Sequence, residues 1–207
     1  MTNGRVVFLD RDGVINEEVG YLNHLDRLRL LPRSAEGIAL LNHAGWRAVV
    51  VTNQSGVATG YFPESFLAEV HAEIQRRLEA AGARVDAFYY CPHHPTIGEP
   101  PYRCACDCRK PRTGLLRRAA ADLDLRLEGS CIISDRYRDL TMAAEIGATG
   151  ILVLTGYGTG EYTWWRQSRG WAAQHVAQDL LQAVRWFLER QAQQPQSAHH
   201  FSGRGPR

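Results

Sequence analysis

The sequence lacks the long apolar run that a transmembrane helix needs. Crossing a bilayer takes about 20 consecutive apolar residues, and no stretch of the 207 residues approaches that length. The short apolar stretch near the N-terminus is interrupted by Asp10, Arg11 and Asp12, so it does not have the pattern of a secretory signal. We therefore expect a cytoplasmic protein with no membrane partner.

The chain also lacks an excess of charge of either sign. Its 24 Lys and Arg residues against 22 Asp and Glu residues give a formal net charge of +2, which offers little support for a nucleic-acid partner. The 44% hydrophobic and 22% charged residues are typical of a globular chain. We expect one monomeric domain over residues 1–191 and a mobile tail over residues 192–207, where a polar sequence has no periodicity.

Cysteine is scarce, and its distribution does not fit a set of disulfides. The chain has five cysteines, an odd number, and three of them are Cys104, Cys106 and Cys108. This crowding favours a metal site in a reducing compartment. Cys131 lies inside an apolar run, where we expect a small core residue.

Five short apolar runs, rich in β-branched or aromatic residues, predict strands. They do not alternate strictly with polar residues, as expected for strands that are covered on both faces. Longer segments with helical spacing separate them, and this alternation predicts an α/β fold with a doubly wound parallel sheet. The predicted strands are residues 5–9, 47–52, 87–90, 130–134 and 150–154. The predicted helices lie near residues 34–44, 63–81, 113–123, 138–146 and 171–190.

Residues 155–171 fit neither pattern. Gly156, Gly158 and Gly160 resemble a phosphate loop, but they lack the dinucleotide spacing and follow a late strand, so we expect a flexible connector. The segment also holds three tryptophans, which either pack against the core, the commoner case, or mark an interface.

Polar residues stand at the carboxyl ends of the predicted strands, where ligands bind in an open parallel sheet. Asp10 and Asp12 follow the first strand, and Thr52 ends the second. Asp135 follows the fourth strand, and Lys110 stands just before a helix. Carboxylates, a hydroxyl and a cation are the groups that handle a phosphoryl group together with a hard metal ion. Independent turn caps have no reason to supply all of them, so we predict a phosphoryl-transfer site.

The spacing of Asp10 and Asp12 suggests how this site works. Two carboxylates this close repel each other, which favours a bound cation or a raised pKa. We expect Mg²⁺ on Asp10, on the backbone carbonyl of Asp12 and on Asp135. Asp10 would attack phosphorus and form an aspartyl phosphate. Asp12, with its carboxyl free to exchange a proton, would act as acid and base, while Thr52 and Lys110 bind the phosphoryl oxygens.

Five motifs extend this picture over about residues 5–155. They are residues 8–16 (FLDRDGVIN), 51–56 (VTNQSG), 91–95 (CPHHP), 106–111 (CDCRKP) and 134–136 (SDR). Together they resemble the haloacid dehalogenase (HAD) superfamily, and more narrowly its branch of heptose-bisphosphate and histidinol-phosphate phosphatases. Ser134 departs from this resemblance, because the family usually has Gly before the metal-binding Asp.

The resemblance implies an HAD-like fold with no large cap domain, and it gives Asp10, Asp12, Thr52 and Lys110 the roles described above. The implied activity is Mg-dependent removal of the 7-phosphate from D-glycero-D-manno-heptose 1,7-bisphosphate, a small sugar phosphate of heptose biosynthesis. Histidinol phosphate is the alternative substrate. The residues that the resemblance places on the substrate are Glu18, Val19, Gly20, Tyr21, Asn53, Gln54, Ser55 and Arg109.

A loop over about residues 91–109 offers a second metal site. It contains a C-x-H pair and a C-x-C pair, whose nitrogen and sulfur ligands suit tetrahedral zinc. The resemblance implies a structural Zn²⁺ on these four side chains and leaves Cys104 and His94 spare. Zinc would then brace the segment that presents Arg109 and Lys110. The predicted zinc ligands are Cys91, His93, Cys106 and Cys108.

Two other classes of protein share part of this pattern. A phosphoacceptor signalling domain also combines an Asp at a strand end with a hydroxyl and a Lys. Asp12 argues against it, because an acid that speeds dephosphorylation does not serve a signal. A zinc-stapled adaptor for nucleic acid or protein would need a basic face, which the net charge does not favour.

Overall fold

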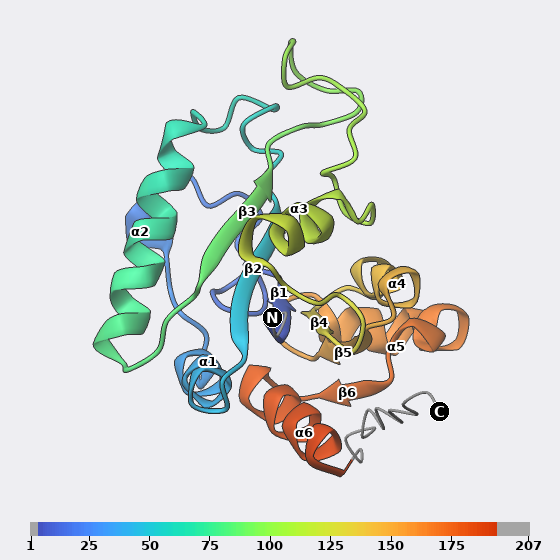
Figure 1. The fold of residues 1–207 in the computed structure, drawn as a ribbon. Helices are drawn as coiled ribbons and strands as arrows, with labels where there is room; N and C mark the ends of the chain where they lie inside the picture. Colours follow the sequence, from blue (N-terminus) through green and yellow to red (C-terminus); the bar gives the residue numbers. More distant parts are fainter. Residues whose placement is uncertain (1–3, 194–207) are drawn as a thin grey trace, which may run out of the picture.

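The computed structural model describes residues 4–193, and it contains one six-stranded parallel sheet (Figure 1). The order across the sheet is β3-β2-β1-β4-β5-β6, so the chain winds outward in both directions and the switch point lies between β1 and β4. Five strands lie where the sequence predicts them, and the first and last residue of each differ from the prediction by at most one position. The strands are β1 (Val6–Leu9), β2 (Arg47–Asn53), β3 (Ala87–Cys91), β4 (Cys131–Ser134), β5 (Thr149–Val153) and β6 (His175–Ala177).

Helices cover both faces of this sheet, which explains why its strands are apolar on both sides. One face packs against α1 (Ser34–His43), α2 (Ser65–Ala80) and α6 (Leu180–Gln193). The other face packs against α3 (Gly114–Leu123) and α4 (Tyr137–Ile146). The doubly wound α/β fold is therefore confirmed.

The spacing of apolar residues accounts for the helices that were predicted. In α2, for example, Leu67, Val70, Ile74 and Leu78 recur every three or four residues and are all buried. The exposed side of α2 carries ion pairs instead, such as Glu73 with two arginines. One buried stripe and one charged stripe place this helix against the sheet.

The prediction of a single helix over residues 171–190 is wrong in its first part. Residues 175–177 form β6, which pairs with β5, and α6 begins only at Leu180. Gln174 prepares this pairing, because its backbone N–H donates to Gly150 and its side chain accepts from the Gly150 N–H. A strand of three residues is too short to show a period of its own in the sequence.

The prediction of a flexible connector around the three glycines is also wrong after residue 157, because α5 (Gly158–Arg169) occupies this segment. The helix begins where Gly158 passes the Val153 carbonyl so closely that a Cβ would collide with it. The three tryptophans do not pack in the core either. Trp164 is 77% exposed, Trp165 45% and Trp171 67%.

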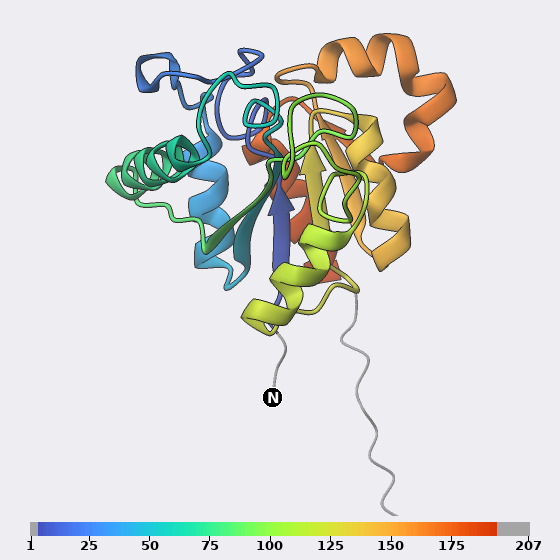
Figure 2. The ribbon, with the colours of Figure 1, turned by 90° about the horizontal axis from the view of Figure 1, so that it is seen from above.

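The strands point toward one end of the molecule, where the connecting loops and α5 gather (Figure 2). No helix within residues 4–193 has the length and apolarity to cross a membrane. Helix α6 extends through Gln193, two residues into the expected tail. The rest of that tail lies outside the described residues.

Candidate active site

The ends of β1, β2 and β4 enclose a cavity of about 390 Å³ at the loop end of the sheet. The backbone N–H of Asp10 donates to the Ile133 carbonyl at 3.0 Å, which ties the end of β1 to β4. Almost all of the predicted catalytic and substrate residues line this cavity. They are Asp10, Asp12, Glu18, Gly20, Tyr21, Thr52, Asn53, Gln54, Ser55, Arg109, Lys110 and Asp135.

Val19 is the exception among the predicted substrate residues. Its side chain packs against the hydrophobic core instead of lining the cavity, so its assignment to the substrate is corrected. The sequence reasoning also missed five residues of the cavity wall. They are Gly56, Arg136, Arg138, Asp139 and Tyr157.

Lys110 lies between two carboxylates at the centre of the site. Its Nζ is 2.7 Å from Asp10 Oδ2 and 2.7 Å from Asp139 Oδ2, and its side chain is only 3% exposed. Although burial opposes it, the charges of Asp10 and Asp139 raise the pKa of Lys110. Lys110 is also the one lysine in the sequence, since all other Lys and Arg positions are Arg. Asp139 lies in the first turn of α4, four residues after Asp135, so it stands close to the end of β4.

The two carboxylates of the DxD motif have different environments. Burial raises the pKa of Asp10 to about 6, against the opposing effect of Lys110. Burial also acts on Asp12, but Arg11, Asn16 and Gln54 outweigh it and lower the Asp12 pKa. Arg11 binds this carboxylate through two nitrogens at 2.8–3.2 Å.

The remaining donors to Asp12 are the side-chain amides of Asn16 at 2.8 Å and Gln54 at 2.9 Å. These neighbours hold the Asp12 carboxyl in place, and its role in proton exchange stays a prediction. The group is ionised and fixed in place, because its neighbours favour the charged form.

Asp135 and Asp10 together fit a hard cation. Burial and then the charge of Asp10 raise the pKa of Asp135 to about 8, even though the Tyr157 N–H donates to Asp135 Oδ2 at 2.8 Å. A Cβ on Gly13 or Gly156 would collide with this carboxylate, so two glycines leave room for it. Two repelling carboxylates and a nearby backbone carbonyl make an all-oxygen donor set, as Mg²⁺ prefers.

The residues after β2 join the site to the loop that carries Lys110. The side-chain amide of Asn53 accepts from the Lys110 N–H at 3.0 Å and donates to the Lys110 carbonyl at 3.2 Å. Thr52 is buried, and its hydroxyl oxygen accepts from the Gln54 amide at 2.9 Å. Asn53, which the sequence assigns to the substrate, thus also fixes the backbone of Lys110.

The four predicted zinc ligands meet in the loop beyond β3, and their ligand atoms all lie within 4.8 Å of one another. The sulfur atoms of Cys91 and Cys106 are 3.6 Å apart, and His93 Nδ1 is 3.3 Å from the Cys108 sulfur. Ligands about 2.3 Å from a tetrahedral zinc have similar separations. The donor set therefore fits zinc.

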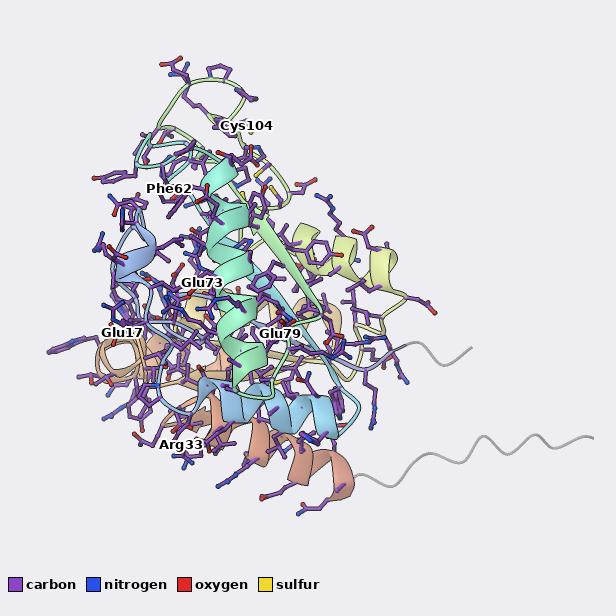
Figure 3. The ribbon with its side chains drawn as sticks, turned by 90° about the vertical axis from the view of Figure 1, so that its left-hand side faces the viewer. Glu17, Arg33, Phe62, Glu73, Glu79 and Cys104 are labelled. Atoms are coloured by element: carbon purple, nitrogen blue, oxygen red, sulfur yellow. The ribbon has the colours of Figure 1, made fainter. Side chains whose placement is uncertain are left out.

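The two spare residues of the loop lie outside this cluster. The ring of His94 accepts the backbone N–H groups of Thr96 at 3.2 Å and Ile97 at 3.0 Å, so it closes a turn. Cys104 stands further out on the same loop, beyond the N-terminal end of α2 (Figure 3).

Short contacts connect the zinc cluster and α5 to the cavity. Arg109 Nη1 donates to the carbonyl of His93 at 2.9 Å, so a cavity cation is held by a residue of the cluster. On the other side, the guanidinium of Arg136 lies 3.8 Å from the ring centre of Tyr157. The hydroxyl of Ser134, at the position where the family usually has Gly, accepts the Arg136 N–H at 3.2 Å.

The HAD-hydrolase-like family model matches residues 107–183. The fold and the site thus define an HAD-like hydrolase. The D-glycero-D-manno-heptose-1,7-bisphosphate 7-phosphatase of Thermosynechococcus vestitus is 40% identical over 192 residues, which are 87% of this chain and 94% of that protein. A similarly named protein of Pseudomonas putida is 41% identical over 74% of this chain and 85% of its own length. The chain belongs to this phosphatase family.

A solved structure gives the same relationship in three dimensions. D,D-heptose 1,7-bisphosphate phosphatase of B. bronchiseptica, complexed with magnesium and phosphate, superposes with a TM-score of 0.79 at 35% identity. The match covers 90% of this chain and 99% of that one. The HAD-like fold expected from the motifs is confirmed.

Proposed function

We propose that this chain removes the 7-phosphate of D-glycero-D-manno-heptose 1,7-bisphosphate. The observation that carries the proposal is the positive charge of the cavity wall away from Lys110. The guanidinium groups of Arg109, Arg136 and Arg138 line it, while the ion pairs of the cavity use other cations, Arg11 and Lys110. Three available cations favour a substrate with a second anionic group.

The same charges disfavour the alternative substrate. The leaving group of histidinol phosphate carries an ammonium group, which the three guanidinium groups would repel. Within the wall, Glu18 offers a carboxylate, but its Oε1 already accepts the Gly20 N–H at 2.6 Å. The names of the relatives described above add support for the heptose substrate and none for histidinol phosphate.

In the first step, a carboxylate oxygen of Asp10 attacks phosphorus, the P–O bond to the sugar breaks, and the sugar oxygen leaves with a proton. Lys110 holds Asp10 in position and offsets the charge of the phosphoryl oxygens, which the Thr52 hydroxyl also binds. Mg²⁺, held by Asp10, Asp135 and the backbone carbonyl of Asp12, would supply the positive charge that lets two anions meet.

Asp12 carries the proton in both steps. It is ionised in the free enzyme, and the charge of an incoming phosphate raises its pKa, so it takes up a proton that it then donates to the leaving oxygen. In the second step the Asp12 carboxylate removes a proton from water, which attacks the aspartyl phosphate and releases inorganic phosphate. Arg11, Asn16 and Gln54 keep this carboxylate aligned throughout.

The test is turnover of both substrates by one preparation, followed by ³¹P NMR. We expect loss of the 7-phosphate signal and retention of the 1-phosphate signal of the heptose bisphosphate. Turnover of histidinol phosphate should be lower by at least about two orders of magnitude, since like-charge contacts of this kind are worth several kcal/mol. Equal turnover would contradict the proposal. Arg136→Ala should reduce the preference for the heptose bisphosphate over histidinol phosphate, mainly through a higher KM for the bisphosphate.

We also infer that the enzyme acts in the cytoplasm, as a monomer and without nucleic acid. The near-balanced charge of the chain supports the absence of a nucleic-acid partner. Sedimentation equilibrium tests the monomer, and a gel shift at moderate salt tests nucleic-acid binding.

A further inference from the structure

Helix α5 stands apart from the body of the protein. Gly158 is its one buried residue, and all eight residues from 162 to 169 are exposed. An ordinary surface helix buries a stripe of apolar side chains against the core, whereas no residue in the second half of α5 is buried. Figure 2 shows α5 (orange) at the loop end of the molecule, outside the layers that cover the sheet.

Large aromatic side chains are concentrated on this open helix and the turn that follows. Of the eight large hydrophobic residues that are exposed within residues 4–193, five fall between residues 157 and 171. Trp164 and Trp171 are 77% and 67% exposed. Exposed aromatic area of this size is unfavourable in water and marks a surface that another phase or molecule covers.

The charges on this surface are positive. The guanidinium of Arg166 lies 5.2 Å from the ring centre of Tyr162, and that of Arg169 lies 4.7 Å from the ring centre of Trp165. Glu161 is the one acidic residue between 157 and 172, and its Oε2 accepts the Tyr137 N–H at 3.0 Å. Two arginines stacked on aromatic rings keep their N–H groups available for anions.

The arrangement favours a lipid surface over a second copy of the chain. Consecutive residues point about 100° apart around a helix, so Trp164 and Trp165 leave α5 on different sides. A flat protein partner would cover only one side of α5, but a fluid layer of lipid headgroups can contact side chains on several sides of the helix. Two copies that packed Arg166 and Arg169 against each other across a two-fold axis would also bring like charges together, which is repulsive.

We propose that residues 157–172 dock on a membrane surface that carries anionic phospholipids. Tryptophan and tyrosine rings sit in the headgroup region, where amphipathic rings are stable, and Arg166 and Arg169 bind lipid phosphates. This peripheral contact differs from the expectation, drawn from the sequence, of no membrane partner. Tyr157 lines the catalytic cavity, so docking holds the cavity close to the membrane while its substrate remains soluble.

The test is cosedimentation of the full chain with two kinds of vesicle, one of phosphatidylglycerol and phosphatidylcholine in equal parts and one of phosphatidylcholine alone. We expect binding to the first kind, weakened by salt. The pair Trp164→Ala and Trp171→Ala should weaken it roughly ten-fold or more, because buried aromatic area is lost. Arg166→Ala and Arg169→Ala should each weaken it about five-fold.

Matched controls lie outside the surface. Ile97 is 50% exposed on another loop, and Arg190 stacks on Trp186 with a centroid distance of 5.4 Å. Ile97→Ala and Arg190→Ala should leave vesicle binding unchanged, and all the variants should keep wild-type phosphatase activity in solution. No binding to phosphatidylglycerol vesicles, or equal binding to both kinds, overturns the proposal. A dimer that forms without lipid, and that dissociates when Trp164 and Trp171 are both changed to Ala, would also overturn the proposal.

Discussion

The catalytic cavity and the zinc loop lie at the same end of the sheet, but different forces hold them. Lys110 and Asp135 are buried in the cavity wall, and the backbone of Asp10 is bonded to β4. In the loop, none of the residues from 93 to 109 is buried. The fold itself therefore positions the carboxylates, whereas the loop depends on the four ligand atoms that meet in its centre.

This difference matters because the two regions share a boundary. Arg109 is bonded to His93 in the loop, and the neighbouring Lys110 is bonded through its backbone to Asn53 at the end of β2. The position of Arg109 therefore depends on the loop, and the position of Lys110 depends on the sheet. Changes in the cavity should therefore act mainly on the chemistry, whereas loss of the loop's metal should loosen substrate binding and spare the nucleophile.

The largest effect is expected in the cavity, from Asp10→Asn. The amide cannot attack phosphorus, so turnover should fall by about four orders of magnitude or more. The melting temperature should stay close to wild type, because the change also removes one of several repelling carboxylates. Steady-state kinetics and thermal unfolding measure the two.

The matched control is Asp12→Asn, two residues away. An aryl phosphate has a good leaving group and needs no acid, but the variant lacks the base for the second step. It should accumulate a phosphorylated chain, heavier by about 80 Da, the mass of one phosphoryl group, after acid quench. Wild-type turnover of aryl phosphate without this adduct would contradict the assignment of Asp12.

Lys110→Ala is the next largest change and links chemistry to stability. Loss of its charge should lower turnover by about two to three orders of magnitude. It also leaves Asp10 and Asp139 buried without their cation, which should destabilise the fold by about 3–5 kcal/mol. The double variant with Asp139→Asn should regain part of the stability and none of the activity, in urea unfolding and kinetic assays.

Removal of zinc should have a smaller effect, confined to the loop side. We expect a zinc chelator in the presence of excess Mg²⁺, or Cys106→Ser, to lower kcat/KM for the heptose bisphosphate by about one to two orders of magnitude. The cause is the loss of order around Arg109, so the rise in KM should exceed the fall in kcat. The α/β core should keep its circular dichroism. Cys104→Ser, outside the cluster, is the control and should change neither.

The smallest effect tests a residue that belongs to neither region. His71 is 9% exposed and stacks on Phe88 with centroids 4.6 Å apart, and burial lowers its pKa from 6.5 to about 3. Between these two values the unfolded chain binds more protons, so stability should fall with pH by about 1.4 kcal/mol for each unit below 6.5. His71→Phe should lose less stability than wild type between pH 6.5 and 5, by about 2 kcal/mol in urea unfolding. Equal losses would mean that His71 is protonated in the folded state.

The sequence by itself determined the first five strands of the chain, because continuous apolar runs and the helical periods between them are local patterns. It also brought Asp10, Thr52 and Asp135 to one cavity, since parallel strands direct their carboxyl ends to the same edge. Lys110 stands in a loop before α3, and its place in the site came from the resemblance of its motif. The metal ligands of the loop were readable for a similar reason. Two Cys/His pairs at close spacing are already typical of a zinc site in the sequence alone.

Only the tertiary structure decided the rest, because the deciding partners are distant in sequence. Three residues became β6 since β5 had a free edge for them. Asn53 fixes a lysine 57 positions away, which no local period encodes. The ion pair of Arg11 with Asp12 also depends on the fold, which buries Arg11 to 1% exposure and turns it onto that carboxylate. Burial and long-range pairing, which set charge states and contacts, arise only when the chain is folded.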